Sequence, residues 1–160
     1  MCTANALIGS VAAAMQRSDL PVAWLLTFST HLRKPALDDP DLLAACAGGL
    51  KEAAVRNGYP VHALAIMPDH VHMVVGAGLA AHSISKMVNN LKGVASRRVF
   101  QISPELKMDL GSAHLWTNGY DVRHLFGPRA LHAACLYVKQ NPVKLGLPEQ
   151  HYDWLEAKSR

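Results

Sequence analysis

The chain has 160 residues, of which 50% are hydrophobic and 18% are charged, with a formal net charge of +4 and a pI of about 9.1. This length and balance fit one globular domain and exclude a disordered chain or two separate domains. The three cysteines, Cys2, Cys46 and Cys135, contain no close pair, which excludes a disulfide framework or a zinc ribbon and favours a cytoplasmic protein.

Residues 1–20 are expected to be an N-terminal extension and residues 21–160 a single domain. The apolar run over residues 6–15 has no positive charge ahead of it and is too short to cross a membrane. We therefore expect a short helical or disordered segment there, and no membrane partner. The domain starts with a predicted strand over residues 23–31, because this stretch is rich in β-forming side chains.

A helix is predicted next, over residues 38–56, because acidic residues and a proline precede it and Asn57-Gly58 is a typical stop. Two apolar runs follow, over residues 59–67 and 70–75. The Pro68-Asp69 dipeptide between them indicates a short turn, so the two runs are predicted to pair as an antiparallel hairpin.

Residues 83–100 carry apolar side chains at helical spacing, which predicts an amphipathic helix. Residues 101–113 are expected to form a loop and residues 115–126 a fourth strand. A last helix opens at Gly127-Pro128 and is expected to close at Asn141-Pro142, because a residue before proline is disfavoured in the α conformation. On the face opposite its apolar side chains, the helix predicted over residues 83–100 carries four cations: Lys86, Lys92, Arg97 and Arg98.

The predicted order of elements is therefore β-α-β-β-α-β-α. This order indicates an α+β fold, in which helices pack on an antiparallel sheet to form a ferredoxin-like, RRM-like palm. Such a sheet leaves strand edges that need cover, and pairing the sheets of two chains would provide it.

His70 and His72 are the first residues that could carry chemistry. Residues two apart in a strand point to the same face, so both imidazoles would project together while Val71 is buried on the opposite face. Two adjacent imidazoles can chelate a divalent ion. With nine histidines in the chain, such a pair also arises by chance, so the spacing alone leaves both a metal site and a structural pair open.

Tyr137 and Asn141 lie one turn apart on the last predicted helix and therefore share a face. By themselves they fit an amphipathic core residue and a helix stop. Beside a metal held by the two histidines, however, Tyr137 could be a nucleophile. A phenol with a pKa of about 10 attacks well only when the electrophile is polarised or the phenolate is stabilised.

Four blocks of sequence, in this order, resemble the HUH single-tyrosine transposases, in which U is a hydrophobic residue. The blocks are MPDHVHMVV over residues 67–75, LKG and SR within residues 91–97, LWTNGY over residues 115–120 and YVKQNPVKLGL over residues 137–147. The last block is similar to the tyrosine helix of the insertion-sequence 200/605 transposases and of the REP-associated tyrosine transposases. The resemblance runs from about residue 23 to residue 155.

This resemblance implies an enzyme that cuts and rejoins single-stranded DNA with the help of Mg²⁺ or Mn²⁺. Tyr137 would attack a phosphodiester, leaving a 5′-phosphotyrosine and a free 3′-OH, and another 3′-OH would then attack that linkage. His70, His72 and Asn141 would be the metal ligands.

The resemblance also implies partners. These are hairpin-forming ends of a DNA element and a second copy of the chain, with the tyrosine helix of one subunit able to serve the histidines of the other. The cations expected to contact DNA are Lys86, Lys92, Arg97, Arg98, Lys139 and Lys144.

Several alternatives remain open. A replication-initiator-type HUH endonuclease shares the histidine pair and a downstream tyrosine, but it usually has lysine where this chain has Gln140. A domesticated DNA-binding module would have lost catalysis, whereas the expected site residues are all present here. A structural metal site or a hydrolase would need carboxylates beside the histidines, and strand alternation is expected to point Asp69 away from His70. The helix cations could be only a solvated surface.

Overall fold

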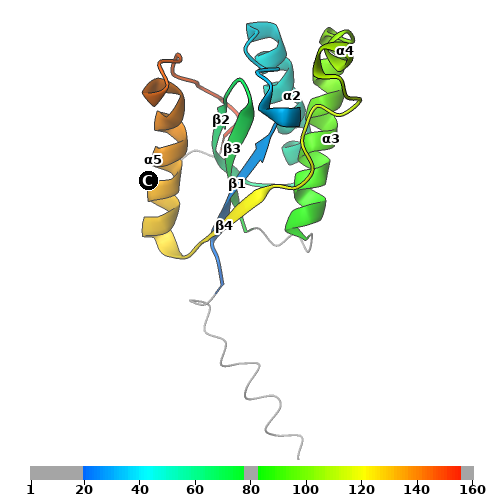
Figure 1. The fold of residues 1–160 in the computed structure, drawn as a ribbon. Helices are drawn as coiled ribbons and strands as arrows, with labels where there is room; N and C mark the ends of the chain where they lie inside the picture. The colour runs from blue at the N-terminus through cyan, green and yellow to red at the C-terminus, as the bar shows by residue number, and fades with distance from the viewer. Residues whose placement is uncertain (1–19, 78–82, 156–160) are drawn as a thin grey trace, which may run out of the picture.

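The computed structural model describes residues 20–77 and 83–155, so the extension expected over residues 1–20 lies outside the described ranges except for Leu20. In these ranges, four strands form one antiparallel sheet in the order β2-β3-β1-β4, with helices on both faces (Figure 1). The strands are β1 (Ala23–Ser29), β2 (Val61–Ile66), β3 (His70–Gly76) and β4 (Asp121–Leu125). The α+β prediction with a ferredoxin-like sheet is confirmed.

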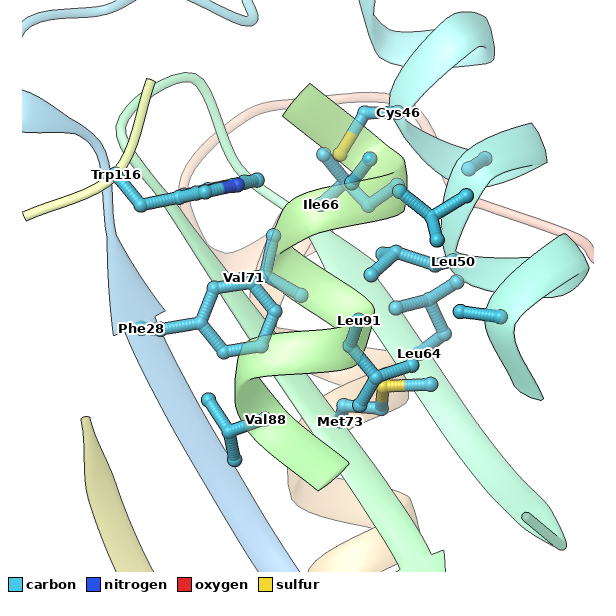
Figure 2. Close-up of a cluster of buried hydrophobic side chains, with 14 of the residues drawn as sticks. Phe28, Cys46, Leu50, Leu64, Ile66, Val71, Met73, Val88, Leu91 and Trp116 are labelled. Carbon is cyan, nitrogen blue, oxygen red and sulfur yellow. The ribbon is translucent and has the colours of Figure 1, made fainter. Parts of the chain in front are cut away.

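Two helices, α2 (Pro40–Asn57) and α3 (Ile84–Ile102), cover one face of the sheet and enclose the larger core (Figure 1). Every second strand residue, such as Phe28, Val71 and Met73, contributes to this core (Figure 2). The two helices approach closely at Gly49, where an added Cβ would lie 2.6 Å from the Cα of Ala95. A side chain at this position would therefore push the helices apart.

The bounds of α2 agree with its sequence signals. The Asp39 side chain accepts hydrogen bonds from the backbone N–H groups of Asp41 and Leu42, at 2.8 and 3.3 Å, which satisfies donors at the helix start. Gly58 ends the helix in the left-handed conformation, with φ of 67°. The hairpin of β2 and β3 is confirmed as well, since the two strands pair antiparallel around the Pro68-Asp69 turn.

The opposite face of the sheet is covered by a single helix, α5 (Gly127–Lys144), among the described residues (Figure 1). Its buried side chains Ala134, Cys135 and Val138 share a second, smaller core with strand residues that include Ala65 and Val74. This is the sheet face toward which the even-numbered residues of β3 point.

The first strand is shorter than the predicted 23–31, because the backbone turns sharply after it. A 3₁₀ turn, η2 (His31–Arg33), follows β1, and Leu32 and Arg33 both adopt left-handed backbone angles with φ of 53° and 52°. Such angles are costly for residues with a side chain and are tolerated where the surrounding structure holds them. Thr30 forms an isolated bridge to Trp116 just before this turn.

The loop predicted over residues 101–113 is wrong in part. Helix α3 extends to Ile102, and a short helix, α4 (Leu106–Leu110), follows. Leu106 and Leu110 are one turn apart and both buried in the larger core, and Gly111 ends the helix with φ of 63°. Burial of two leucines on one face explains the helix, although the stretch is too short to show a period.

The strand predicted over residues 115–126 is real only in its second half, as β4. Leu115 and Trp116 are buried as part of a loop, and the Trp116 ring meets the edge of Phe28 at 4.9 Å between ring centroids. These two residues are of types common in strands, but here their side chains pack in the larger core beneath α3 (Figure 2).

The last helix does not close at Asn141-Pro142 as predicted, because α5 continues through Pro142 to Lys144. Proline removes one backbone donor, and near a helix end this interrupts little of the hydrogen-bond ladder. Pro142 is buried, and its carbonyl accepts a hydrogen bond from Leu145 at 3.1 Å. Packing of the last turn therefore outweighs the local preference of a residue before proline.

The chain after α5 returns to the sheet and contacts the edge of β2 at Ile66. The side-chain amide of Gln150 donates to the Ile66 carbonyl at 2.7 Å and accepts from the Ile66 N–H at 2.9 Å. Tyr152 and Trp154 pack against the larger core. None of the helices in residues 20–77 and 83–155 is long and apolar enough to span a membrane.

Candidate active site at the histidine pair

His70 and His72 open β3 and lie side by side on the face that α5 covers. Their Nε2 atoms are 3.2 Å apart and their ring centroids 4.7 Å apart. Val71, between them, is fully buried on the other face. The alternation expected from the sequence is confirmed, and it brings two ring nitrogens to a common point.

The outer nitrogen of each ring is held by a neighbour. His72 Nδ1 lies 2.9 Å from Thr27 Oγ1, across the β1–β3 pair, and His70 Nδ1 lies 2.6 Å from Asp69 Oδ1. When each ring carries its proton on Nδ1, Nδ1–H donates to these oxygens and leaves both Nε2 lone pairs free. This outer hydrogen bonding is typical of histidines that ligate metals.

The expectation that Asp69 points away from His70 is wrong. β3 begins at His70, so Asp69 belongs to the turn and the alternation of strand residues does not apply to it. Its carboxylate also pairs with Arg33 at 3.1 Å. The contacts of Asp69 with His70 and with Arg33 were not predicted from the sequence, and the usable signal was the Pro-Asp turn directly before the histidine.

The pKa of the Asp69 carboxyl lies below its usual range. Burial acts to raise this pKa, but the hydrogen bond from His70 and the positive charges of His70 and Arg33 together outweigh it. An ionised carboxylate at this position accepts the His70 N–H and helps to fix the orientation of that ring.

Burial also shapes His72, which is 9% exposed. Burial, and then the charges of His70 and Arg33, lower the pKa of the His72 imidazole to about 4. The ring is therefore neutral at pH 7, which is the protonation state that binds a metal.

The lowered pKa of His72 should make the stability of the fold depend on pH. In the unfolded chain the His72 pKa returns to its ordinary value, so the unfolded state takes up a proton first as the pH falls. We expect the free energy of unfolding to decrease by roughly 2–3 kcal/mol between pH 7.5 and 4.5 on account of His72. Urea unfolding of the parent and of His72→Gln at both pH values measures this term, and equal pH dependence in the two proteins would contradict it.

The donor set fits a divalent metal. Two ligands bound at right angles about 2.1 Å from an ion lie about 3.0 Å apart, close to the 3.2 Å between the Nε2 atoms. Within residues 20–77 and 83–155, no three side chains of the types His, Cys, Asp and Glu are placed to hold a metal. A third ligand from the described residues would be of another type, such as an amide oxygen.

Tyr137 is brought to the histidine pair by α5 of the same chain. Its ring centroid is 5.5 Å from that of His72, with the planes inclined at 67°, and the residue is 46% exposed. Asn141 lies one turn further along α5 and is half-buried. No hydrogen bond joins Asn141 to either imidazole within the described chain. The structure therefore places the Tyr137 ring against His72, whereas Asn141 makes no such contact with the histidines.

The cations expected on the 83–100 helix do not form one free face. The Arg98 guanidinium donates to Glu52 of α2 at 2.9 and 2.6 Å, and the Lys92 ammonium donates to the carbonyls of Thr117 and Gly119, both at 2.8 Å. The remaining predicted DNA contacts have exposed side chains: Lys86, Arg97, Lys139 and Lys144.

Comparison with known proteins identifies transposases as relatives of this chain. The family model of IS200-like transposases matches residues 23–141. The ISDra2 transposase TnpA of Deinococcus radiodurans is 37% identical over 83 residues, which are 49% of this chain and 59% of that protein. The chain thus covers less than two thirds of the length of this relative.

Two solved structures resemble the fold. One is a candidate transposase from Deinococcus radiodurans, with a TM-score of 0.59 and 29% identity, which covers 79% of this chain and 94% of the other. The second is a REP-associated tyrosine transposase bound to a REP hairpin, with a TM-score of 0.61 and 13% identity over 83% of this chain and 73% of the other. At that identity the second likeness concerns the fold alone.

Proposed function

The chain belongs to the family of IS200-like transposases, and from this premise we propose that it cuts and rejoins single-stranded DNA through a covalent bond to Tyr137. The observation that carries the proposal is the placement of the Tyr137 ring 5.5 Å from His72, beside two imidazoles that converge on one point. If the two imidazoles hold a metal ion, that ion would polarise a phosphodiester beside the Tyr137 hydroxyl, which suits attack by a side chain in place of water.

In the proposed reaction, the phenolic oxygen of Tyr137 attacks the scissile phosphorus, and the bond from phosphorus to the 3′ oxygen breaks. The phenol proton is lost, and the departing 3′ oxygen takes up a proton to become a hydroxyl. The downstream strand is then held as a 5′-phosphotyrosine. In the second step, a 3′-OH of another strand attacks the same phosphorus and releases Tyr137, so the phosphodiester is restored without an external energy source.

The residues around Tyr137 have separate roles in this proposal. His70, His72 and Asn141 would hold Mg²⁺ or Mn²⁺, which when bound would polarise the scissile phosphate. Thr27 and Asp69 orient the two rings through their outer nitrogens, and Arg33 holds Asp69. The helix α5 sets the distance from the nucleophile to the histidines as a rigid element.

The orientation of the labelled product tests this function. Single-stranded oligonucleotides from the ends of the DNA element that encodes the chain are incubated with the protein and Mn²⁺, each labelled at one end. A 5′-phosphotyrosine predicts that the 3′ label stays with the protein under denaturing conditions, while the 5′ label leaves on a fragment with a free 3′-OH. Adduct formation with the 5′ label instead would contradict the proposed polarity.

We also propose that the DNA partners are hairpin-forming element ends and that the protein acts as a homodimer. The REP-associated relative is bound to a REP hairpin, and exposed cations such as Arg97 and Lys139 could contact phosphates. The outer edge of β4 pairs with no other strand in the described chain, and Asp121 to His124 are exposed. Pairing of two such edges would cover them.

Assembly and sharing of the site can be measured together. We expect a dimer of about 35 kDa by light scattering, twice the chain mass of 17.4 kDa. The linker at Phe126-Gly127, where Gly127 has φ of 77°, could let α5 dock on either subunit. Mixing inactive Tyr137→Phe with inactive His70→Ala subunits should then restore cleavage. If subunits exchange and no cleavage returns, each chain uses its own tyrosine, and a monomer would contradict the assembly.

A further inference from the structure

A pocket of about 330 Å³ lies between α3 and the loop that leads to β4. Helix α3 supplies Asn89, Lys92, Gly93, Ser96 and Phe100, and the loop supplies residues 113–118. The aromatic members offer flat surfaces, with Phe100 half-buried and His114 exposed. Amide, hydroxyl and ammonium groups line the remainder, so the pocket combines stacking surfaces with hydrogen-bonding groups.

The charge of this pocket suits an anionic polymer. Its lining contains, among the described residues, no carboxylate and one cation, Lys92, whose ammonium also donates to the carbonyls of Thr117 and Gly119. Lys107 adds a second cation at its side, 5.0 Å from the centre of the Phe100 ring. A larger pocket, about 400 Å³, is lined by three carboxylates, Asp38, Glu105 and Asp109, and by a single cation, Lys34, so negative charge predominates there and would repel DNA.

The pocket is also built into the same end of the sheet as the histidine pair. Trp116, in its wall, donates from Nε1 to the Lys92 carbonyl at 3.0 Å and bridges to Thr30. Thr30 in turn donates its N–H to the Asp69 carbonyl at 2.9 Å, one residue before His70. The pocket lies on the α3 side of the sheet and Tyr137 on the α5 side, so a single strand with one phosphate at Tyr137 would reach the pocket by passing around this end of the sheet.

Gly93 of α3 is an exposed residue in the lining of this pocket. Glycine in a helix interior is unfavourable by roughly 1 kcal/mol relative to alanine. A Cβ built on Gly93 meets no atom within 4 Å, so no internal packing requires the glycine there. This differs from Gly49, whose missing side chain lets α2 and α3 pack closely. An exposed glycine with free space over it permits close approach of a bound molecule.

We propose that this pocket holds one unpaired nucleobase of the DNA strand on which Tyr137 acts. The base would stack on the aromatic side chains and meet the polar groups of Asn89 or Asn118 with its edge. The proposal rests on the proposed function for the choice of DNA as ligand, but it concerns binding and needs no metal. Stacking of one base typically contributes about 5- to 150-fold in affinity.

Two glycines provide a matched test. Gly48 of α2 is also exposed in a helix interior with nothing within 4 Å of a built Cβ, and it lies outside this pocket. Alanine at either position should raise Tm by about 2–4 °C. We expect Gly93→Ala and the bulkier Gly93→Leu to weaken binding of the element-end oligonucleotide by about tenfold or more, while Gly48→Ala and Gly48→Leu leave it unchanged.

The bound base is then located with oligonucleotides that each lack one base. In fluorescence anisotropy without metal, the parent should lose affinity at one abasic position, and Gly93→Leu should be insensitive at that position alone. Unchanged affinity in Gly93→Leu, equal losses in the Gly48 variants, or no position that couples to Gly93 would overturn the proposal. Failure of cleavage with this coupling intact would contradict the proposed function and leave the base pocket standing.

Discussion

Tyr137→Phe should abolish the covalent protein–DNA adduct while leaving DNA affinity and stability nearly unchanged. The substitution removes only the attacking oxygen, and the ring keeps its edge contact with His72. Because Tyr137 is 46% exposed, loss of its hydroxyl leaves no buried group without a partner. A residue that forms the covalent bond should account for the full rate of cleavage, so we expect a loss of three orders of magnitude or more.

The measurement is a denaturing gel of labelled single-stranded DNA after incubation with Mn²⁺. Tyr59→Phe is a suitable control, because Tyr59 precedes β2 at the end of the sheet away from His70, as the pairing of Val61 with Val75 shows. It should retain the adduct. Persistent adduct in Tyr137→Phe would identify another nucleophile.

Replacement of either histidine should remove metal binding and cleavage together. His70→Ala and His72→Ala each leave one imidazole and the Asn141 amide, which are too few protein donors to hold a hard divalent ion at working concentrations. We expect Mn²⁺ affinity by titration calorimetry to fall at least about a hundredfold and cleavage to fall below detection. Asn141→Ala should weaken Mn²⁺ binding less, since an amide oxygen is the poorer ligand.

His151→Ala controls for the general loss of an imidazole, because His151 is exposed on the chain segment after α5. Excess EDTA should inhibit the parent to the level of the histidine variants. Full cleavage in EDTA, or unchanged Mn²⁺ affinity in His70→Ala, would contradict the metal assignment.

The sequence predicted correctly those parts of the fold whose conformation is determined by residues close together in the sequence. Asp39 and Gly58 act on the ends of their own helix, so the bounds of α2 could be predicted to within two residues. The same holds for the histidine pair, because alternation along a strand is a property of the backbone. The approach of Tyr137 to that pair from α5 depends on the whole fold, and it was expected only from resemblance to a family.

Long-range packing decided the parts that were missed. The cations of α3 look equivalent on a helical projection, but Arg98 finds Glu52 on α2 and Lys92 finds the loop carbonyls. Arg33 pairs with Asp69 from a turn in which two consecutive residues adopt left-handed angles, and their side chains give no signal of such angles. Trp116 looked like a strand residue because burial against Phe28 and burial in a sheet select the same amino acids.

The hydrogen bonds of the Gln150 amide affect whether sheets of several chains can join edge to edge. By bonding both polar groups of Ile66, it occupies part of the β2 edge as a neighbouring strand would. The other edge of the sheet, β4, pairs with no further strand of the described chain. Growth of a fibril needs two such edges on every subunit. Edge-to-edge addition through β4 would form a pair with a twofold axis, and the Gln150 amide would hinder further addition at the Ile66 end of β2.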